Sequence, residues 1–193
     1  MNEQREGAGL KIKVFGDSIL RKKAKRLGRI TDEHRRVLSQ MAKAMYDDFG
    51  IGLAAPQVGH SLQLIVVDIG EGLYKLVNPI IVKRQGRQSI SEGCLSVPGV
   101  SIKVKRAKQV WVQAQDENSR FLEIEAKDLF ACVLQHEIDH LKGKLIIDYA
   151  SFLQKLRIKR KLAALRYASV NGEKNKSVIT RSAATKQSRK LQL

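Results

Sequence analysis

The sequence contains few cysteines and no long apolar run. Its 193 residues include two cysteines, Cys94 and Cys132, so no framework of disulfides is available. No apolar stretch is long enough to span a bilayer, and residues 1–9 are polar, without the apolar segment of a signal peptide. We therefore expect a cytoplasmic protein in a reducing environment, where a thiolate that binds metal is favoured over a disulfide.

Acidic residues are also scarce. The chain has 19 of them against 36 lysines and arginines, which gives a formal net charge of +17. From residue 151 onward there are twelve basic residues and one acidic residue, so +11 of this charge lies in the last part of the chain. Such a segment suits an anionic partner, either RNA or an anionic membrane surface, and a solvated end without a partner is the alternative.

The most informative motif is His136-Glu137-Ile138-Asp139-His140, an H-E-x-x-H. Residues four apart share one face of a helix, so both imidazoles can reach one metal ion. Glu137 lies between them and can handle a proton on a water that the metal activates. A pair of hydrogen-bonded core histidines is the alternative. A metal site needs at least one more ligand than this motif supplies.

The third ligand has to come from elsewhere in the chain. Cys132 lies one turn before the first histidine, and its side chain points along the helix, which favours a buried apolar role. Cys94 lies in a tight segment with glycine and proline, EGCLSVPG, which can present a thiolate across a cleft. The residues alone leave the choice open among these candidates: Cys94, Cys132, His34, His60 and the carboxylates.

Hydrophobic periodicity predicts the elements that hold these residues. Apolar residues recur every three or four positions in 31–49, which predicts a helix with Thr31 as its N-cap and Gly50 just past its end. A second helix is expected over about 128–142, closed by Gly143, and a third, basic one over about 151–167. Strands are expected at 11–20 (ending in a turn), 62–69, 73–82, 100–105, 110–115 and 121–126. An extended loop or irregular strand is expected at 50–59, and a loop at 84–91.

Strands grouped before one long helix indicate an α+β fold. We expect mixed or antiparallel β-sheets packed around the helix that carries the histidines, followed by the basic C-terminal helix. The length and the 43% of hydrophobic residues suit one domain. That domain is expected over 1–167, with a basic, disordered tail at 168–193.

Three strings occur in order: GIGLAAPQVG (50–59), EGCLSVPG (92–99) and QHEIDHLKG (135–143). Together they resemble the three signatures of the peptide deformylase family, G-x-G-x-A-A-x-Q, E-G-C-L-S and H-E-x-x-H. Every signature position is matched, and the resemblance spans about residues 12–165. Two departures are Ser18, where the family often has proline, and the long basic tail. The resemblance implies that 1–167 is the catalytic domain.

The resemblance implies a metal centre and an activity. Cys94, His136 and His140 would bind one divalent metal ion, leaving a fourth position open. In the family this ion is usually ferrous iron, and zinc, nickel or cobalt can take its place. The implied reaction is hydrolytic removal of the formyl group from the N-terminal methionine of new polypeptides, with release of formate.

The resemblance also assigns roles around the metal. Glu137 takes a proton from the attacking water and returns it to the leaving amine. The Gln57 side-chain amide and the Leu95 backbone N–H stabilise the charge that develops on the formyl oxygen. Glu92 and Arg106 brace the site.

Substrate contacts are expected on one strand-like segment and one apolar pocket. Backbone groups of this segment would pair with the extended peptide, and the pocket would receive the methionine side chain. Simple loop or core packing is the alternative for each residue. The residues concerned are Gly50, Ile51, Gly52, Leu129, Cys132 and Val133.

By the same resemblance, the basic helix would dock on the ribosome near the nascent-chain exit, where its charge suits RNA phosphates. We expect a monomer without a membrane span and without DNA binding. Two other classes remain as alternatives. One is an H-E-x-x-H peptidase that cleaves internal peptide bonds, against which Cys94 argues, because those enzymes usually take a histidine or a carboxylate as third ligand. The other is a basic RNA-binding protein whose metal is structural.

Overall fold

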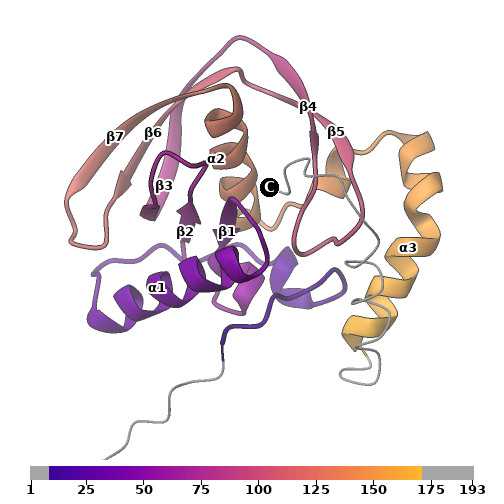
Figure 1. Cartoon of the computed structure of the whole chain (residues 1–193), viewed down its shortest axis with the longest axis horizontal. Helices are drawn as coiled ribbons and strands as arrows, with labels where there is room; N and C mark the ends of the chain where they lie inside the picture. Colours follow the sequence, from indigo (N-terminus) through magenta and orange to yellow (C-terminus); the bar gives the residue numbers. More distant parts are fainter. Residues whose placement is uncertain (1–8, 171–193) are drawn as a thin grey trace, which may run out of the picture.

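The structure is a computed structural model and describes residues 9–170. A five-stranded sheet and a two-stranded sheet lie on either side of one central helix, α2 (Figure 1). This confirms the predicted α+β fold. With η for a 3-10 helix, the elements in chain order are η1 (Ser18–Arg21), α1 (Asp32–Asp47), β1 (Gly52–Ala54), η2 (Ala55–Val58), β2 (Leu64–Val67), β3 (Tyr74–Gln85), β4 (Gln88–Glu92), β5 (Ile102–Arg106), β6 (Gln109–Gln115), β7 (Phe121–Lys127), α2 (Asp128–Leu141), η3 (Ile146–Tyr149) and α3 (Phe152–Val170).

The larger sheet has the order β1-β2-β3-β6-β7, and each neighbouring pair is antiparallel. Burial alternates along β6, where Val110, Val112 and Ala114 are buried and the residues between them are half-buried. The buried set packs with Val133 and Leu134 of α2. Because side chains alternate between the two faces of a strand, this pattern directs one face of the sheet toward α2.

The longest strand, β3, leads from the larger sheet toward the smaller one (Figure 1). Its register with β6 shifts between Val77 and Ile80 and again between Ile81 and Lys83. Asn78, in the first irregularity, has φ 54°, and its side chain exchanges two hydrogen bonds of 2.8 Å with the backbone of residue 27. Bulges of this kind bend a strand and increase its twist.

Two expectations about the chain path are wrong. Residues 11–20 form no strand, because Lys13 and Phe15 donate single hydrogen bonds to the carbonyls of Gln57 in η2 and of Ser96 in the turn after β4, instead of joining a ladder. Residues 84–91 are mostly strand, because β3 runs to Gln85 and β4 begins at Gln88 after a bend at Gly86, whose φ is 66°. That ribbon exposes many of its side chains, so its polar composition resembles that of a loop.

The central helix α2 is buried on almost every side, with eleven of its fourteen residues in the interior. It ends at Leu141, and Gly143, the glycine expected to close it, has a φ of +71°. A Cβ at this position would lie 2.5 Å from the carbonyl oxygen of Arg21. Only glycine combines this left-handed conformation with such a close backbone approach.

The other two helices lie outside this core, and α1 packs on the face of the larger sheet that points away from α2. In α1, Val37, Leu38, Met41 and Met45 recur at helical spacing and pack against residues of β1, β2 and β3, and Thr31 is the N-cap, as predicted.

In the part of the chain that the structure describes, no helix is long and apolar enough to cross a membrane.

The predicted basic helix is present as α3 and lies beside β5 (Figure 1). Its contacts with the core come from Ile158, Leu162 and Leu165, which pack with residues of β5 and η3. The helix continues to Val170, three residues past its expected end. The remainder of the predicted tail, 171–193, lies outside the described residues.

Candidate metal centre

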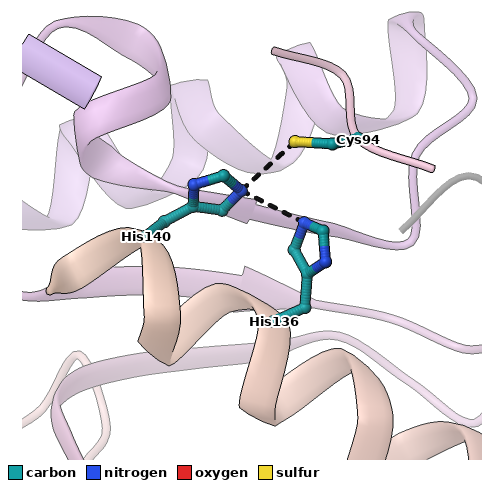
Figure 2. A group of neighbouring side chains, drawn as sticks. All are labelled: Cys94, His136 and His140. Atoms are coloured by element: carbon teal, nitrogen blue, oxygen red, sulfur yellow. Dashed lines mark hydrogen bonds between the residues drawn. The ribbon is translucent and has the colours of Figure 1, made fainter. Parts of the chain in front are cut away.

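Three ligand atoms converge between α2 and the turn that follows β4 (Figure 2). The Nε2 atom of His140 lies 3.1 Å from Nε2 of His136 and 3.3 Å from Sγ of Cys94. All three ligand atoms lie within 4.8 Å of one another. Cys94 is 3% exposed, His136 2% and His140 1%, so the cluster is shielded from bulk water.

Local backbone structure explains this convergence. The two histidines lie one helical turn apart on α2, which gives them a common face. Cys94 lies in a turn closed by a 2.9 Å hydrogen bond from the Val97 N–H to the Cys94 carbonyl. Cys132, the other cysteine, is outside the cluster, with its Sγ 3.2 Å from Gln88 Nε2.

Glu92, at the end of β4, fixes the orientation of the His136 ring. Its Oε2 lies 3.0 Å from His136 Nδ1. Arg106 binds both carboxylate oxygens, with its Nε 2.7 Å from Oε1 and its Nη2 2.9 Å from Oε2. Burial acts to raise the pKa of Glu92, but the hydrogen bonds from Arg106 and His136 bring it below its usual value. Glu92 is therefore a charged, buried acceptor that holds the proton of His136 on Nδ1 and leaves Nε2 free to bind a metal.

Glu137 is buried beside the cluster, at 0% exposure. Neither of its carboxylate oxygens has a hydrogen-bond partner among the described residues. Burial, together with the negative charges of Glu92 and Asp139, raises the pKa of Glu137 well above its usual value. A Cβ on Gly52 would lie 2.5 Å from Glu137 Oε1, so the glycine lets the backbone of β1 approach this carboxylate. An unpaired buried carboxylate of this kind is typical of a functional site.

Gln57 and Leu95 lie close to the cluster. The Gln57 side chain accepts a 2.8 Å hydrogen bond from the Ala54 N–H, which directs its NH₂ group toward Ser96 Oγ at 3.3 Å and Cys94 Sγ at 3.8 Å. Leu95 follows the cysteine directly in the chain. A Cβ on Gly50 would lie 2.9 Å from Leu95 Cδ1, so these two residues are in contact.

The residues expected in the methionine pocket lie along β1 and α2. Val133 is buried and lies against Gly52, where a Cβ would be 2.9 Å from its Cγ1. Ile51 and Leu129 are half-buried and pack against the same hydrophobic cluster. Cys132 is fully buried, with its thiol directed to Gln88.

The donor set fits a divalent metal ion. Burial and the neighbouring His136 lower the pKa of His140 well below its usual value, which favours the neutral imidazole that metals bind. Burial raises the pKa of the Cys94 thiol, and the charge of Glu137 raises it further. A bound cation reverses this preference, because it stabilises the thiolate. One thiolate and two imidazoles leave an open position, the arrangement of catalytic sites.

Sequence reasoning missed two residues at the edge of this site, Asp139 and Tyr149. The Arg106 Nη1 lies 2.5 Å from Asp139 Oδ2, and the Tyr149 hydroxyl donates to the same oxygen at 2.6 Å. The sequence could have indicated Asp139, because it occupies the second variable position of the H-E-x-x-H motif. Nothing in the sequence pattern marks Tyr149, because its role depends on the contact between η3 and α2.

The fold and the site define a class: an α+β protein whose buried Cys-His-His cluster and adjacent glutamate are those of a metal-dependent hydrolase. Residues 10–156 match the model of the polypeptide deformylase family. This chain belongs to that family, as the three sequence signatures indicated.

Relatives of known sequence agree with this placement. The chain is 46% identical over 146 residues to a peptide deformylase of Pelotomaculum thermopropionicum, covering 76% of this chain and 94% of that protein. It is 53% identical over 134 residues to a peptide deformylase of Syntrophomonas wolfei, covering 69% and 88%.

Solved structures agree as well. A peptide deformylase from Legionella pneumophila superposes with a TM-score of 0.79 at 40% identity, covering 86% of this chain and 99% of that one. A peptide deformylase from Synechococcus elongatus in complex with actinonin gives 0.77 at 41% identity, covering 83% and 91%.

The unpaired carboxylate of Glu137 gives a pH-dependent cost in stability. Because its folded pKa is raised above the ordinary value of 4.5, the folded state binds more protons than the unfolded state between these two pKa values. This group therefore makes the metal-free protein less stable as pH rises, by up to about 1.4 kcal/mol per pH unit in that window. Glu137→Gln removes the charge, so its advantage over the wild type should grow from pH 5 to pH 8 in urea unfolding. An advantage that is equal at both pH values would contradict this account.

Proposed function

We propose that this protein hydrolyses the N-formyl group from the N-terminal methionine of newly made polypeptides and releases formate. The convergence of Cys94, His136 and His140 beside the unpaired carboxylate of Glu137, in a chain that belongs to the deformylase family, is the observation that carries this proposal. This activity implies a cytoplasmic location, because new polypeptides emerge there. The monomeric state and the lack of DNA binding remain predictions.

Cys94, His136 and His140 would hold one divalent metal ion, ferrous iron in the native enzyme, with zinc, nickel or cobalt as substitutes. Such an ion lowers the pKa of water toward neutrality and polarises a carbonyl oxygen. The thiolate of Cys94 and the imidazoles of His136 and His140 would be its protein ligands. Glu92 supports the set, since its hydrogen bond fixes the tautomer of His136.

Glu137 would be the general base and then the general acid. Its carboxylate has no partner within the described residues, so it is available to take a proton from the attacking water and pass it to the leaving amine. The raised pKa of Glu137 suits the second step, because a carboxyl group of higher pKa holds the proton until the amine leaves. The Gln57 amide and the Leu95 backbone N–H would stabilise the charge on the formyl oxygen.

The peptide would lie along the free edge of β1. This strand is at the end of the sheet and pairs on one side with β2, which leaves its other edge open for strand addition. The Ile51 carbonyl already accepts a hydrogen bond from the Asp68 N–H, so Ile51 would offer its N–H and Gly52 its backbone groups. The methionine side chain would enter the apolar surroundings of Val133, Leu129 and Cys132. Gly50 would support this strand through its contact with Leu95.

A formyl-methionyl tripeptide and its unformylated twin test the proposed activity. The metal-loaded protein should release formate from the first peptide and leave all peptide bonds of both intact. Glu137→Gln should lower turnover by about a hundred- to ten-thousand-fold with unchanged metal content, because it removes the general base and keeps the shape of the side chain. Cleavage within either peptide would select the peptidase alternative, and full activity of Glu137→Gln would overturn the role of this residue.

The two cysteines form a matched pair for testing the ligand set. Cys94→Ala should lose most of the bound metal, because two imidazoles alone make a weak site. Cys132→Ala should keep it, since the Cys132 thiol contacts Gln88 and lies outside the cluster. Elemental analysis of both variants after dialysis provides the measurement. Equal metal content in the two would remove Cys94 from the ligand set.

The basic helix α3 would dock on ribosomal RNA. Six basic side chains of this helix are exposed, and the helix contains no acidic residue. Exposed cations of this kind bind phosphates and release counterions on doing so. The six residues are Lys155, Arg157, Lys159, Arg160, Lys161 and Arg166.

Ribosome co-sedimentation at low and high salt tests this docking. Changing Lys155, Lys159 and Arg160 together to Gln should weaken binding several-fold at low salt and flatten its salt dependence. The matched control changes Arg26, Arg29 and Arg36 to Gln, which removes the same charge near α1. Equal binding of the two triple variants would contradict a specific role of α3.

A further inference from the structure

We propose that Tyr149 and Asp139 are positioning residues of the metal centre, which act through Arg106 and Glu92 to hold the His136 imidazole toward the metal. The inference rests on the metal site proposed above and is independent of the substrate. It concerns two residues that do not themselves reach the cluster of ligand atoms.

A continuous series of hydrogen bonds joins Tyr149 to His136. The Tyr149 hydroxyl donates to Asp139 Oδ2 at 2.6 Å, and Arg106 Nη1 donates to the same oxygen at 2.5 Å. Arg106 then binds both oxygens of Glu92, and Glu92 Oε2 accepts from His136 Nδ1 at 3.0 Å. Each step is a charge-assisted bond, which is shorter and stronger than a bond between neutral groups.

The guanidinium of Arg106 is held in three ways, which fixes its plane. Glu92 engages Nε and Nη2, and Asp139 engages Nη1. The ring of Tyr149 covers the guanidinium carbon, with 4.8 Å between that carbon and the ring centroid. The Arg106 side chain is 5% exposed, so a lost partner would not be replaced freely by water. The position of Glu92, and with it the angle of the His136 ring, therefore depends on Asp139 and Tyr149.

The position of Tyr149 is fixed by the short helix η3, which lies outside α2. Tyr149 ends this helix, in which Asp148 accepts a 2.9 Å hydrogen bond from the Leu145 N–H and pairs with Arg21 at 2.6 Å. Burial and the hydrogen bond to Asp139 raise the pKa of Tyr149 to about 12, so the hydroxyl keeps its proton and acts as a donor. Tyr149 thus ties the segment before α3 to the helix that carries both histidines.

Tyr149→Phe is the direct test, because it removes the hydroxyl and keeps the ring over Arg106. The matched control is Tyr46→Phe, which deletes another 2.6 Å bond from a tyrosine to an aspartate, Asp68, whose side chain bonds to Tyr46 and to the backbone of residues 70 and 72 instead of to Arg106. Asp139→Asn is the second variant, since it removes the charge that both donors share. All three are prepared in the full chain and loaded with cobalt.

Two measurements report on the metal centre without enzyme turnover: the cobalt affinity in competition with a chelator, and the visible absorption of bound cobalt. Residues that hydrogen-bond to a metal-ligating histidine typically contribute about ten- to a hundred-fold to metal affinity. Asp139→Asn should fall in that range, and Tyr149→Phe should weaken binding by about three- to ten-fold because it acts one step further away. Both should alter the cobalt spectrum, while Tyr46→Phe should match the wild type.

Cobalt affinity and spectrum in Tyr149→Phe equal to those of Tyr46→Phe would overturn the inference, even if its melting temperature were lower, since a purely structural bond changes only the latter. If Asp139→Asn does not fold, Tyr149→Phe alone decides. Failure of the wild type to bind cobalt would instead overturn the proposed metal site.

Discussion

The buried ion pair between Glu92 and Arg106 is the interaction on which the site depends. It joins the two strands of the small sheet, and through His136 and Asp139 it joins that sheet to the central helix. Glu92 has no exposed surface, so without Arg106 its charge would lie unpaired in the interior. The pair therefore sets the distance between β4 and α2. The turn that carries Cys94 follows β4 directly, so the same interaction brings the thiol to the histidines.

Around this pair the protein keeps several polar groups in an interior that does not satisfy them all. The Glu137 oxygens and His140 Nδ1 have no hydrogen-bond partner among the described residues, and the Cys94 thiol is buried. Such groups lower the stability of a fold. The apolar clusters on both faces of the larger sheet offset this cost. This is the distribution expected where a site is built for chemistry and the surrounding core supplies the stability.

Local patterns predicted the parts of the fold that depend on local physics. The periodicity of α1 and α2, the left-handed stop at Gly143 and the alternation in β6 follow from one segment each. The two wrong predictions, at 11–20 and 84–91, concern segments whose state is decided by partners far away in the chain. The preference for Cys94 over Cys132 as the third ligand came from the family resemblance, because the residues alone could not say which thiol lies beside the two histidines. Tyr149 could not be found from the sequence, since its contact with Asp139 depends on how η3 packs.

X-ray absorption of the metal-loaded protein tests the proposed metal centre directly, because it counts the atoms bound to the ion. With zinc, we expect one sulfur at about 2.3 Å, two imidazole nitrogens at about 2.0–2.1 Å and one further light atom in the open position. A spectrum without sulfur, with a second sulfur or with a third imidazole would contradict a catalytic centre built from Cys94, His136 and His140.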